Sequence, residues 1–163
     1  MAIDVLLYHS GMSGAPGANL RVAGGLTDLL NACLVDGFNV RDITGIVRSG
    51  TTATATIDGS NPWQIGGVIE LAGADQAAYN GRQRVTARTD STVSFEVSGS
   101  PATPATGTIT AKMPGAGWTL ESDLSLSEQG AIVTYSRTGR EAIFTFTAVD
   151  ASTTNVILVI NEK

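Results

Sequence analysis

The sequence has few of the residues from which catalytic and metal sites are usually built. Its 163 residues include one cysteine and one histidine. A single cysteine excludes an internal disulfide, and one cysteine with one histidine cannot complete a zinc site of the usual nitrogen and sulfur ligands. Cys33 lies among Leu29, Leu30 and Leu34, which favours a buried and unreactive thiol. We therefore expect no metal, no cofactor and no thiol chemistry.

Motifs of the common enzyme classes are also missing. His9 lies beside Ser10 and Ser13, but the segment has no G-x-S-x-G elbow, and a structural histidine is expected. No P-loop, G-x-G-x-x-G or EF-hand pattern is present. Carboxylates that could pair for glycan cleavage are Asp75, Glu96, Glu121, Asp123 and Glu128. Solvated acidic side chains are the simpler interpretation, so we expect no enzymatic activity.

Charge is scarce. Charged residues make up 15% of the chain, against roughly 25% in an ordinary soluble protein. The net charge of −5 is the wrong sign for a protein that coats nucleic acid. Only two of the ten basic residues are lysines, and arginine is the cation that interfaces prefer, although codon bias explains the same ratio equally well. A weakly charged exterior is typical of a surface that other subunits cover.

Long apolar runs are absent as well. No stretch approaches the roughly 20 apolar residues that a membrane helix needs. No basic segment followed by an apolar run opens the sequence, so no secretory signal is expected. The sequence therefore predicts a soluble protein made in a cytoplasm, with no membrane partner.

One segment has the apolar spacing of a helix. Five apolar residues recur at intervals of three and four, which places them on one face. They are Leu26, Leu29, Leu30, Cys33 and Leu34. Gly37 follows at a position suited to a helix end. We predict one α-helix here and no other.

The rest of the chain has the residue pattern of β-strands and turns. Short runs rich in threonine, valine and isoleucine alternate with glycine, asparagine, aspartate and serine. Strands are predicted at 3–8, 40–48, 51–58, 67–72, 82–89, 92–98, 106–112, 131–137, 141–149 and 156–160. Residues 98–107 contain two prolines and are expected to be a loop, as is the stretch 114–130. The fold class is therefore mainly β with one α-helix.

Two features of the predicted strands bear on function. Asn80-Gly81 predicts a type I′ hairpin turn, in which both residues adopt positive φ. In the next strand Arg82, Arg84 and Arg88 alternate with Val85, so the three arginines are expected on one face. That face either protects an edge strand from unwanted pairing or docks onto an acidic neighbour, and the sequence favours neither.

The spacing of the strands predicts a two-part organisation. Several short strands at near-regular intervals indicate a β-sandwich or a small β-barrel. We expect this inserted β-domain at 45–113. Residues 1–44 and 114–163 are expected to form an α+β framing unit around it.

Several of these motifs resemble one protein family. The segments YHSGMSGAPG (8–17), LTDLLNACLVDGF (26–38), IELAGADQAAYNGRQRVTA (69–87) and SPATPATGTITAK (100–112) are similar to segments of small virion proteins of tailed bacteriophages. Gly117-Trp118 matches a Gly-Trp pair near the exit of the family's small β-domain. The resemblance covers roughly residues 6–118, and after it only AIVTYSR (131–137) echoes the family pattern.

The resemblance implies a structural role in a virion. The expected function is a capsid decoration (cement) protein that bridges major capsid subunits. The alternatives are a tail-side protein for fibre attachment or the baseplate, and a receptor- or carbohydrate-binding module. Expected partners are capsid or tail subunits and further copies of this chain. Candidate interface residues are Tyr79, Arg82, Arg84, Arg88, Trp63 and Trp118.

Overall fold

The computed structural model describes residues 6, 8, 12–16, 25–126, 130–137, 140–148 and 156–162. Its contacts divide the chain into two compact units. The barrel unit contains Met1–Ala15 and Phe38–Pro114, and the helix–sheet unit contains Pro16–Gly37 and Gly115–Lys163. The barrel therefore starts at Phe38, whereas the sequence placed the start of a β-domain at 45.

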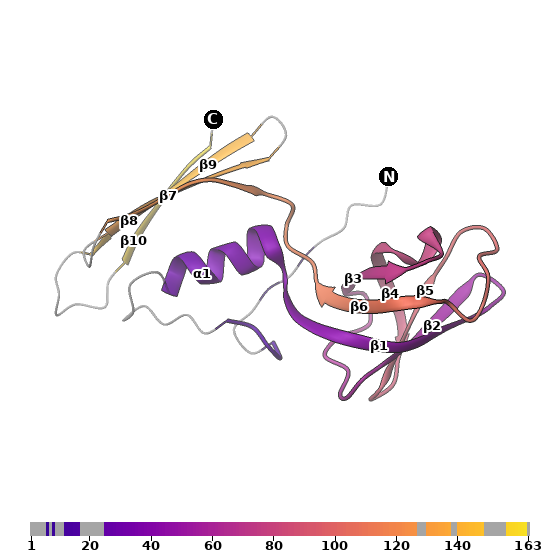
Figure 1. Cartoon of the computed structure of the whole chain (residues 1–163). Coiled ribbons are helices and arrows are strands. Elements are labelled where there is room, and N and C mark those ends of the chain that lie inside the picture. Colours follow the sequence, from indigo (N-terminus) through magenta and orange to yellow (C-terminus); the bar gives the residue numbers. More distant parts are fainter. Residues whose placement is uncertain are drawn as a thin grey trace. The chain divides into compact units, whose positions relative to one another are not determined.

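The barrel unit is a closed sheet of short antiparallel strands (Figure 1). Its strands are β1 (Phe38–Ser49), β2 (Thr52–Ile57), β3 (Val68–Ala74), β4 (Gly81–Arg88), β5 (Thr92–Glu96) and β6 (Gly107–Met113). They pair in the order β1-β2-β5-β4-β3-β6, and β6 pairs again with β1. The prediction of a mainly β protein is confirmed, and the β-domain is a barrel.

Strand β1 closes the barrel because it serves two neighbours. Its first half pairs with β6, up to Ile43↔Ile109, and its second half pairs with β2, from Ile43↔Ile57 onward. The register shifts within each pairing, between Phe38 and Arg41 and between Ile43 and Gly45. Such irregularities bend a strand and increase its twist, which lets one long strand turn the corner of a small barrel.

Alternation along each strand fills the barrel interior. Ala53 and Ala55 of β2 and Val93 and Phe95 of β5 are fully buried, while the residues between them are outside. Small alanines on β2 leave room for the Phe95 ring inside the same barrel. This period of two is the pattern that predicts strands, and it places the core without further signals.

Strands β3 and β6 approach closely at a pair of glycines. Gly73 has a φ of +85° and Gly107 a φ of +110°, values that favour glycine over any other residue. A Cβ on Gly73 would collide with the carbonyl oxygen of Thr108, and a Cβ on Gly107 would collide with that of Gly73. The pairing of β3 with β6 shifts register here, between Ala72 and Ala74.

The predicted type I′ turn at Asn80-Gly81 is wrong. Asn80 has a φ of −78°, and it follows a short 3-10 helix, η2 (Ala77–Tyr79), so the β3–β4 connection is longer than two residues. The Asn80 amide instead pairs with the backbone of Ala74. It accepts from Ala74 N at 2.9 Å and donates to Ala74 O at 2.7 Å. The asparagine side chain thus takes the place of a backbone partner, and this use of asparagine leaves the same sequence signal as a turn.

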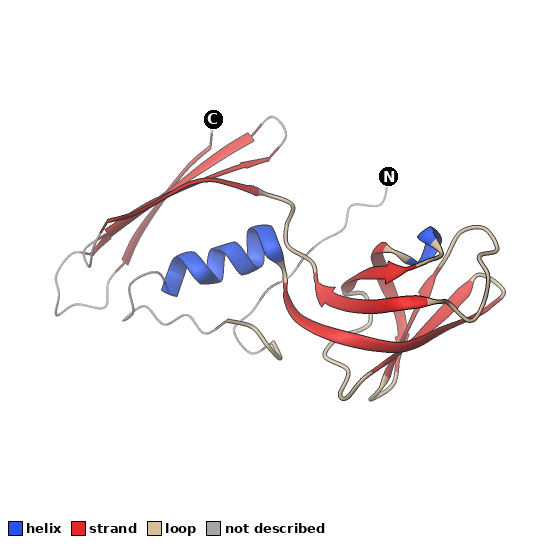
Figure 2. Ribbon diagram, viewed as in Figure 1, coloured by secondary structure: helices blue, strands red, loops and turns tan. Residues whose placement is uncertain are grey.

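The helix–sheet unit contains the predicted helix and a second antiparallel sheet (Figure 2). The helix α1 (Gly25–Asn31) continues into a π-helical turn, η1 (Ala32–Asp36), and ends at Gly37, whose φ is +76°. The strands are β7 (Thr119–Leu126), β8 (Gly130–Arg137), β9 (Arg140–Ala148) and β10 (Val156–Glu162), paired in the order β10-β9-β8-β7.

Tyr135 joins the helix to this sheet. It is fully buried on β8, and partly buried Leu30, Leu34 and Trp118 pack against it. Its hydroxyl donates to Asn31 Oδ1 at 2.7 Å, so the phenol has a polar partner inside an apolar contact. The leucine stripe predicted from the sequence therefore contributes to this contact through Leu30 and Leu34.

Most predicted strands are confirmed within one or two residues, but the predicted loop at 114–130 is not. Strand β7 occupies Thr119–Leu126. Its leucines lie at alternate positions, 120, 124 and 126, but Ser122 interrupts that apolar row, and the pairing with β8 shifts register between Leu120 and Ser122. The strand expected at 3–8 falls mostly outside the described residues, and Leu6 and Tyr8 belong to no strand. Within the described part of the chain, no helix is long and apolar enough to cross a membrane.

We predict that Gly73→Ala destabilises the protein more than Gly59→Ala does. Both glycines have a φ near +90°, but a Cβ at Gly59 meets no atom within 4 Å, so its alanine variant measures conformational strain alone, on the order of 1–3 kcal/mol. The Gly73 variant adds the collision with the Thr108 backbone. Urea unfolding of both variants checks this, and equal losses would show that the β3–β6 approach is not tight.

Candidate functional site

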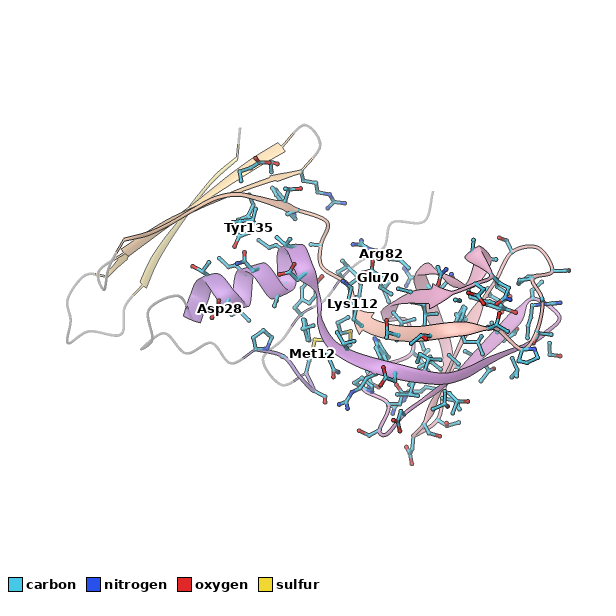
Figure 3. All side chains as sticks on the ribbon, in the orientation of Figure 1. Met12, Asp28, Glu70, Arg82, Lys112 and Tyr135 are labelled. Carbon is cyan, nitrogen blue, oxygen red and sulfur yellow. The ribbon has the colours of Figure 1, made fainter. Side chains whose placement is uncertain are left out.

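Two of the three candidate arginines lie on the outer face of the barrel. Arg82 and Arg84 are exposed on β4. Arg82 is paired with Glu70 on β3, and Glu70 is paired with Lys112 on β6, so three neighbouring strands carry a cation, an anion and a cation (Figure 3). Directly opposed side chains of opposite charge attract each other modestly across a sheet. This row is a polar patch with alternating signs rather than a purely basic stripe.

The expectation that Arg88 shares this face is wrong. A register shift between Val85 and Ala87 adds one residue to β4, so Arg88 pairs with the buried Val93 and lies on the inner side of the sheet. There its guanidinium donates to Gln64 Oε1 at 3.1 Å and to Asn61 O at 3.4 Å. Arg88 therefore holds a loop of its own unit.

The pairing of β4 bears on the interpretation of the arginines as guards of an edge strand. Strand β4 pairs with β3 on one side and β5 on the other, because the barrel is closed. The pairs with β3 involve Gly81–Arg84 and those with β5 involve Val85–Arg88, so the half of β4 that carries Arg82 and Arg84 is paired with β3 alone. Protection of this half-paired stretch and docking onto an acidic neighbour both stay as interpretations for Arg82 and Arg84.

The candidate aromatic residues are core residues to different degrees. Tyr79 and Trp63 are fully buried in the barrel unit, and Tyr79 Oη donates to Ala102 O at 3.0 Å. Their side chains are not part of an exposed surface. Trp118 is half-buried in the helix–sheet unit against Tyr135. Cys33 is also half-buried, and burial raises the pKa of its thiol, which disfavours the reactive thiolate.

The candidate acidic residues whose side chains are described each accept a hydrogen bond from a hydroxyl group. Asp75 accepts from Thr106 Oγ1 at 2.7 Å, Glu96 accepts from Thr52 Oγ1 at 3.0 Å, and Glu121 accepts from Ser136. In the described residues, no group of three potential metal ligands occurs. His9, Glu128 and the side chain of Asp123 lie outside the described part of the structure.

The outer side of β2 and β5 forms a surface that we call the threonine face. Because Ala53, Ala55 and Phe95 point inward, the residues between them point outward. The threonine face consists of Thr52, Thr54, Thr56, Thr92, Ser94 and Glu96. Its hydroxyls pair across the strands: Thr54 and Ser94 share a hydrogen bond of 3.0 Å, and Thr52 bonds to Glu96. Beside it on β1, Val47 is 57% exposed.

The sequence contains the signal for this face, but by itself the pattern predicts only a strand. The run Thr52–Ile57 alternates hydroxyl and apolar residues without a charge. Strand β5 repeats the pattern from Thr92 to Phe95. What the sequence could not give is the pairing of β2 with β5, which places the two hydroxyl rows side by side.

A second feature is the loop between β2 and β3, residues 60–67, which we call the Trp63 loop. Buried Asn61 anchors it: the Asn61 amide donates to Thr89 O at 2.9 Å and to Thr92 O at 2.7 Å, and its oxygen accepts from Trp63 N at 2.9 Å. Backbone bonds from Gly66 N to Val85 O and from Val85 N to Gly67 O attach its other end to β4. Arg88 of β4 bonds to Gln64 in the middle of the loop, so the loop is held at both ends and at its centre.

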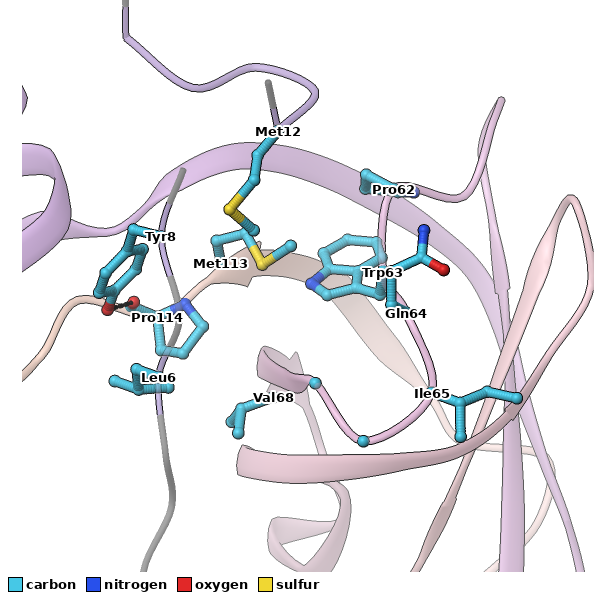
Figure 4. Close-up of a pocket in the computed structure, with 12 residues that line it drawn as sticks. Leu6, Tyr8, Met12, Pro62, Trp63, Gln64, Ile65, Val68, Met113 and Pro114 are labelled. Atoms are coloured by element: carbon cyan, nitrogen blue, oxygen red, sulfur yellow. Dashed lines mark hydrogen bonds between the residues drawn. The ribbon is translucent and has the colours of Figure 1, made fainter. Parts of the chain in front are cut away.

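The Trp63 loop lines an apolar cavity of about 340 Å³ within the barrel unit (Figure 4). The lining is Leu6, Tyr8, Met12, Pro62–Val68, Met113 and Pro114. Tyr8 Oη donates to Pro114 O at 2.6 Å, which ties the N-terminal segment to the end of β6. Three segments that are distant in the sequence thus line the cavity, so no local sequence motif predicts it.

The cavity contains an unusual polar group. Trp63 Nε1 is buried and finds no hydrogen-bond acceptor among the described residues. Figure 4 shows the nitrogen on the side of the indole that faces Met113 and Pro114. An indole nitrogen only donates, and a buried donor without a partner costs about 1–3 kcal/mol. Such a group in a native structure needs an explanation.

We compared the chain with protein-family models, curated proteins and solved structures. No family model, curated protein or solved structure matches this chain.

We predict that Arg88→Lys destabilises the barrel unit by about 1–2 kcal/mol, because lysine cannot reproduce the forked contacts to Gln64 and Asn61. The matched change Arg82→Lys keeps a cation on the exposed outer face and is expected to cost less than about 0.5 kcal/mol. Chemical denaturation measures both variants. If Arg82→Lys were the more damaging of the two, the assignment of Arg88 to the inner side would be wrong.

Proposed function

We propose that this chain is a non-enzymatic structural protein of a tailed-phage virion, and specifically a capsid decoration protein that bridges major capsid subunits. In this proposal it works as a homo-oligomer on the particle surface after synthesis in the host cytoplasm. The resemblance of residues 6–118 to small virion proteins supports the phage assignment. The surface of the barrel unit supports the docking role.

The threonine face is the observation that carries this proposal. Five of its six side chains are uncharged hydroxyl residues, and the one carboxylate, Glu96, already accepts a hydrogen bond from Thr52. Removing water from a charge costs far more than removing it from a hydroxyl that keeps its hydrogen bond. The threonine methyl groups and exposed Val47 add apolar area. A partner can therefore cover this face at low desolvation cost, and charge depletion is typical of interface centres.

Arg82 and Arg84 complement this face in the proposal. They lie on the adjacent strand β4, on the same outer side of the barrel, and Arg82 forms a row with Glu70 and Lys112. Exposed charges of alternating sign add little affinity, but they penalise a misaligned partner. The threonine face supplies the covered area and the charged row sets the register.

A carbohydrate-binding module is less well supported. Sugar rings stack on exposed aromatic faces, but Trp63 is fully buried and Trp118 packs against Tyr135. A tail-side role uses the same docking chemistry as a decoration role, so copy number is the property that separates the two.

We expect the chain to be present on tail-less capsids in numbers comparable with the major capsid protein. Quantitative mass spectrometry of purified capsids and of purified tails measures this, because a decoration protein occupies repeated sites on the shell. Enrichment in the tail fraction at a few copies per particle would contradict the decoration role and support the tail-side role. Absence from both fractions would contradict the virion proposal altogether.

We predict that Thr54→Lys weakens incorporation into particles by at least about tenfold, because it buries an unpaired charge in the centre of the threonine face. Thr108→Lys is the matched control, since Thr108 is exposed on the outer side of β6, away from that face. Both variants are expected to unfold within about 0.5 kcal/mol of the parent. Equal incorporation of the two variants would show that β2 and β5 do not contact a partner.

A further inference from the structure

We propose that the cavity beside Trp63 receives an apolar side chain from an extended segment of a neighbouring virion subunit, whose main-chain carbonyl accepts a hydrogen bond from Trp63 Nε1. The inference rests on the proposed function, because it takes the occupant from an adjoining protein. It concerns a different part of the barrel unit from the threonine face.

The chemistry of the cavity defines the occupant. Leu6, Met12, Val68, Met113 and the prolines give it an apolar wall, which favours an aliphatic or aromatic group. The buried Trp63 Nε1 has a proton to donate and no acceptor among the described residues, so the occupant must also bring an acceptor. An apolar residue of an extended peptide brings both, because its own carbonyl lies next to its side chain.

The size of the cavity fits this occupant. An engineered cavity of about 150 Å³ holds benzene. The cavity beside Trp63 has about 340 Å³, which accommodates a large apolar side chain together with the adjoining peptide unit. The volume is too small for a folded element, so a single anchoring residue is the appropriate class.

The rim points to a protein rather than to a free small molecule. Ile65 is 65% exposed in the same loop that lines the cavity. A small ligand that filled the cavity would leave Ile65 in water, whereas a protein surface around the anchor would cover it. An apolar anchor in a pocket surrounded by further apolar contact is the usual arrangement at the energetic centre of an interface.

The cavity is also formed in advance. Asn61 and the Gly66–Val85 and Gly67–Val85 backbone bonds hold the Trp63 loop, and Tyr8 bonds to Pro114 on the opposite wall. A binding site that is already in place loses little conformational entropy when it is filled. Trp63 has no exposed surface, so an acceptor reaches Nε1 when a flexible side chain of the lining, such as Met12 or Met113, moves aside.

The first arm of the test uses the full chain and N-acetyl-leucine N-methylamide as a probe of the anchor. The two indole N–H signals are followed by NMR on protein labelled with ¹⁵N-tryptophan, and Trp118→Phe identifies the signal of Trp63. We expect a saturable downfield shift of the Trp63 signal, because a new N–H···O bond forms. N-acetyl-glycine N-methylamide, which has the carbonyls but no side chain, should bind at least about tenfold more weakly.

The second arm asks whether the occupant comes from the particle. Ile65→Ser changes the rim, and Val40→Ser is the matched control because Val40 is 64% exposed in the same unit and does not line the cavity. We expect only Ile65→Ser to reduce incorporation into particles, by roughly tenfold for a well-packed contact.

The two arms separate failure of the inference from failure of the proposed function. A Trp63 signal that saturating leucine probe leaves unmoved, or equal binding of the glycine probe, overturns the anchor site even if the chain is abundant on capsids. Normal incorporation of Ile65→Ser overturns the anchor as well. Absence of the parent chain from every virion fraction overturns the virion source, whatever the probe does.

Discussion

Closure of the barrel is the constraint on which the described surfaces of this unit depend. The first half of strand β1 pairs with β6 and its second half pairs with β2, so the strand has to bend between the two halves. The register shifts in β1 provide the bend, and the glycine pair on β3 and β6 lets those strands come closer than side chains allow. Each of these features is local, but together they fix which residues face outward.

A closed sheet changes the meaning of its polar residues. In an open sheet, charges on a terminal strand keep other strands from adding to it. Here β4 pairs with β3 through Gly81–Arg84 and with β5 through Val85–Arg88, so it is not a terminal strand of the sheet. In the proposed docking role, outward side chains of β4 contact the neighbouring subunit.

The sequence predicted the barrel strands well because each obeys a period of two over a run bounded by turn residues. Predictions failed where a bulge or a side chain interrupts that period. Arg88 changed faces because one residue is inserted after Val85, and β7 was missed because Ser122 interrupts its row of leucines. The Asn80-Gly81 pair misled because asparagine pairs here with the backbone of Ala74. These are interactions between distant strands or between side chain and backbone, which a single sequence does not display.

The candidate sites show the same division. The threonine face was present in the sequence as an alternation of hydroxyl and apolar residues, and only the partner strand was unknown. The cavity beside Trp63 left no trace, because Tyr8, Trp63 and Pro114 meet only after the barrel has closed. Arg88 is part of neither the threonine face nor the cavity lining. It holds the Trp63 loop, which lines the cavity, through its bonds to Gln64 and Asn61.

The buried indole nitrogen of Trp63 is better understood as a consequence of where the loop is held than as a packing fault. Phenylalanine would fill much of the same space without leaving a donor unpaired, at a saving of about 1–3 kcal/mol. The loop could also relax toward an acceptor, but Asn61, Arg88 and the bonds to Val85 prevent this. The loop is therefore most stable in a position that leaves its largest side chain short of one hydrogen bond. A partner that supplies the missing acceptor gains this free energy on binding, whereas an apolar partner without a carbonyl does not. In the proposed anchor site, specificity for a peptide segment follows from the rigidity of the loop as much as from the shape of the cavity.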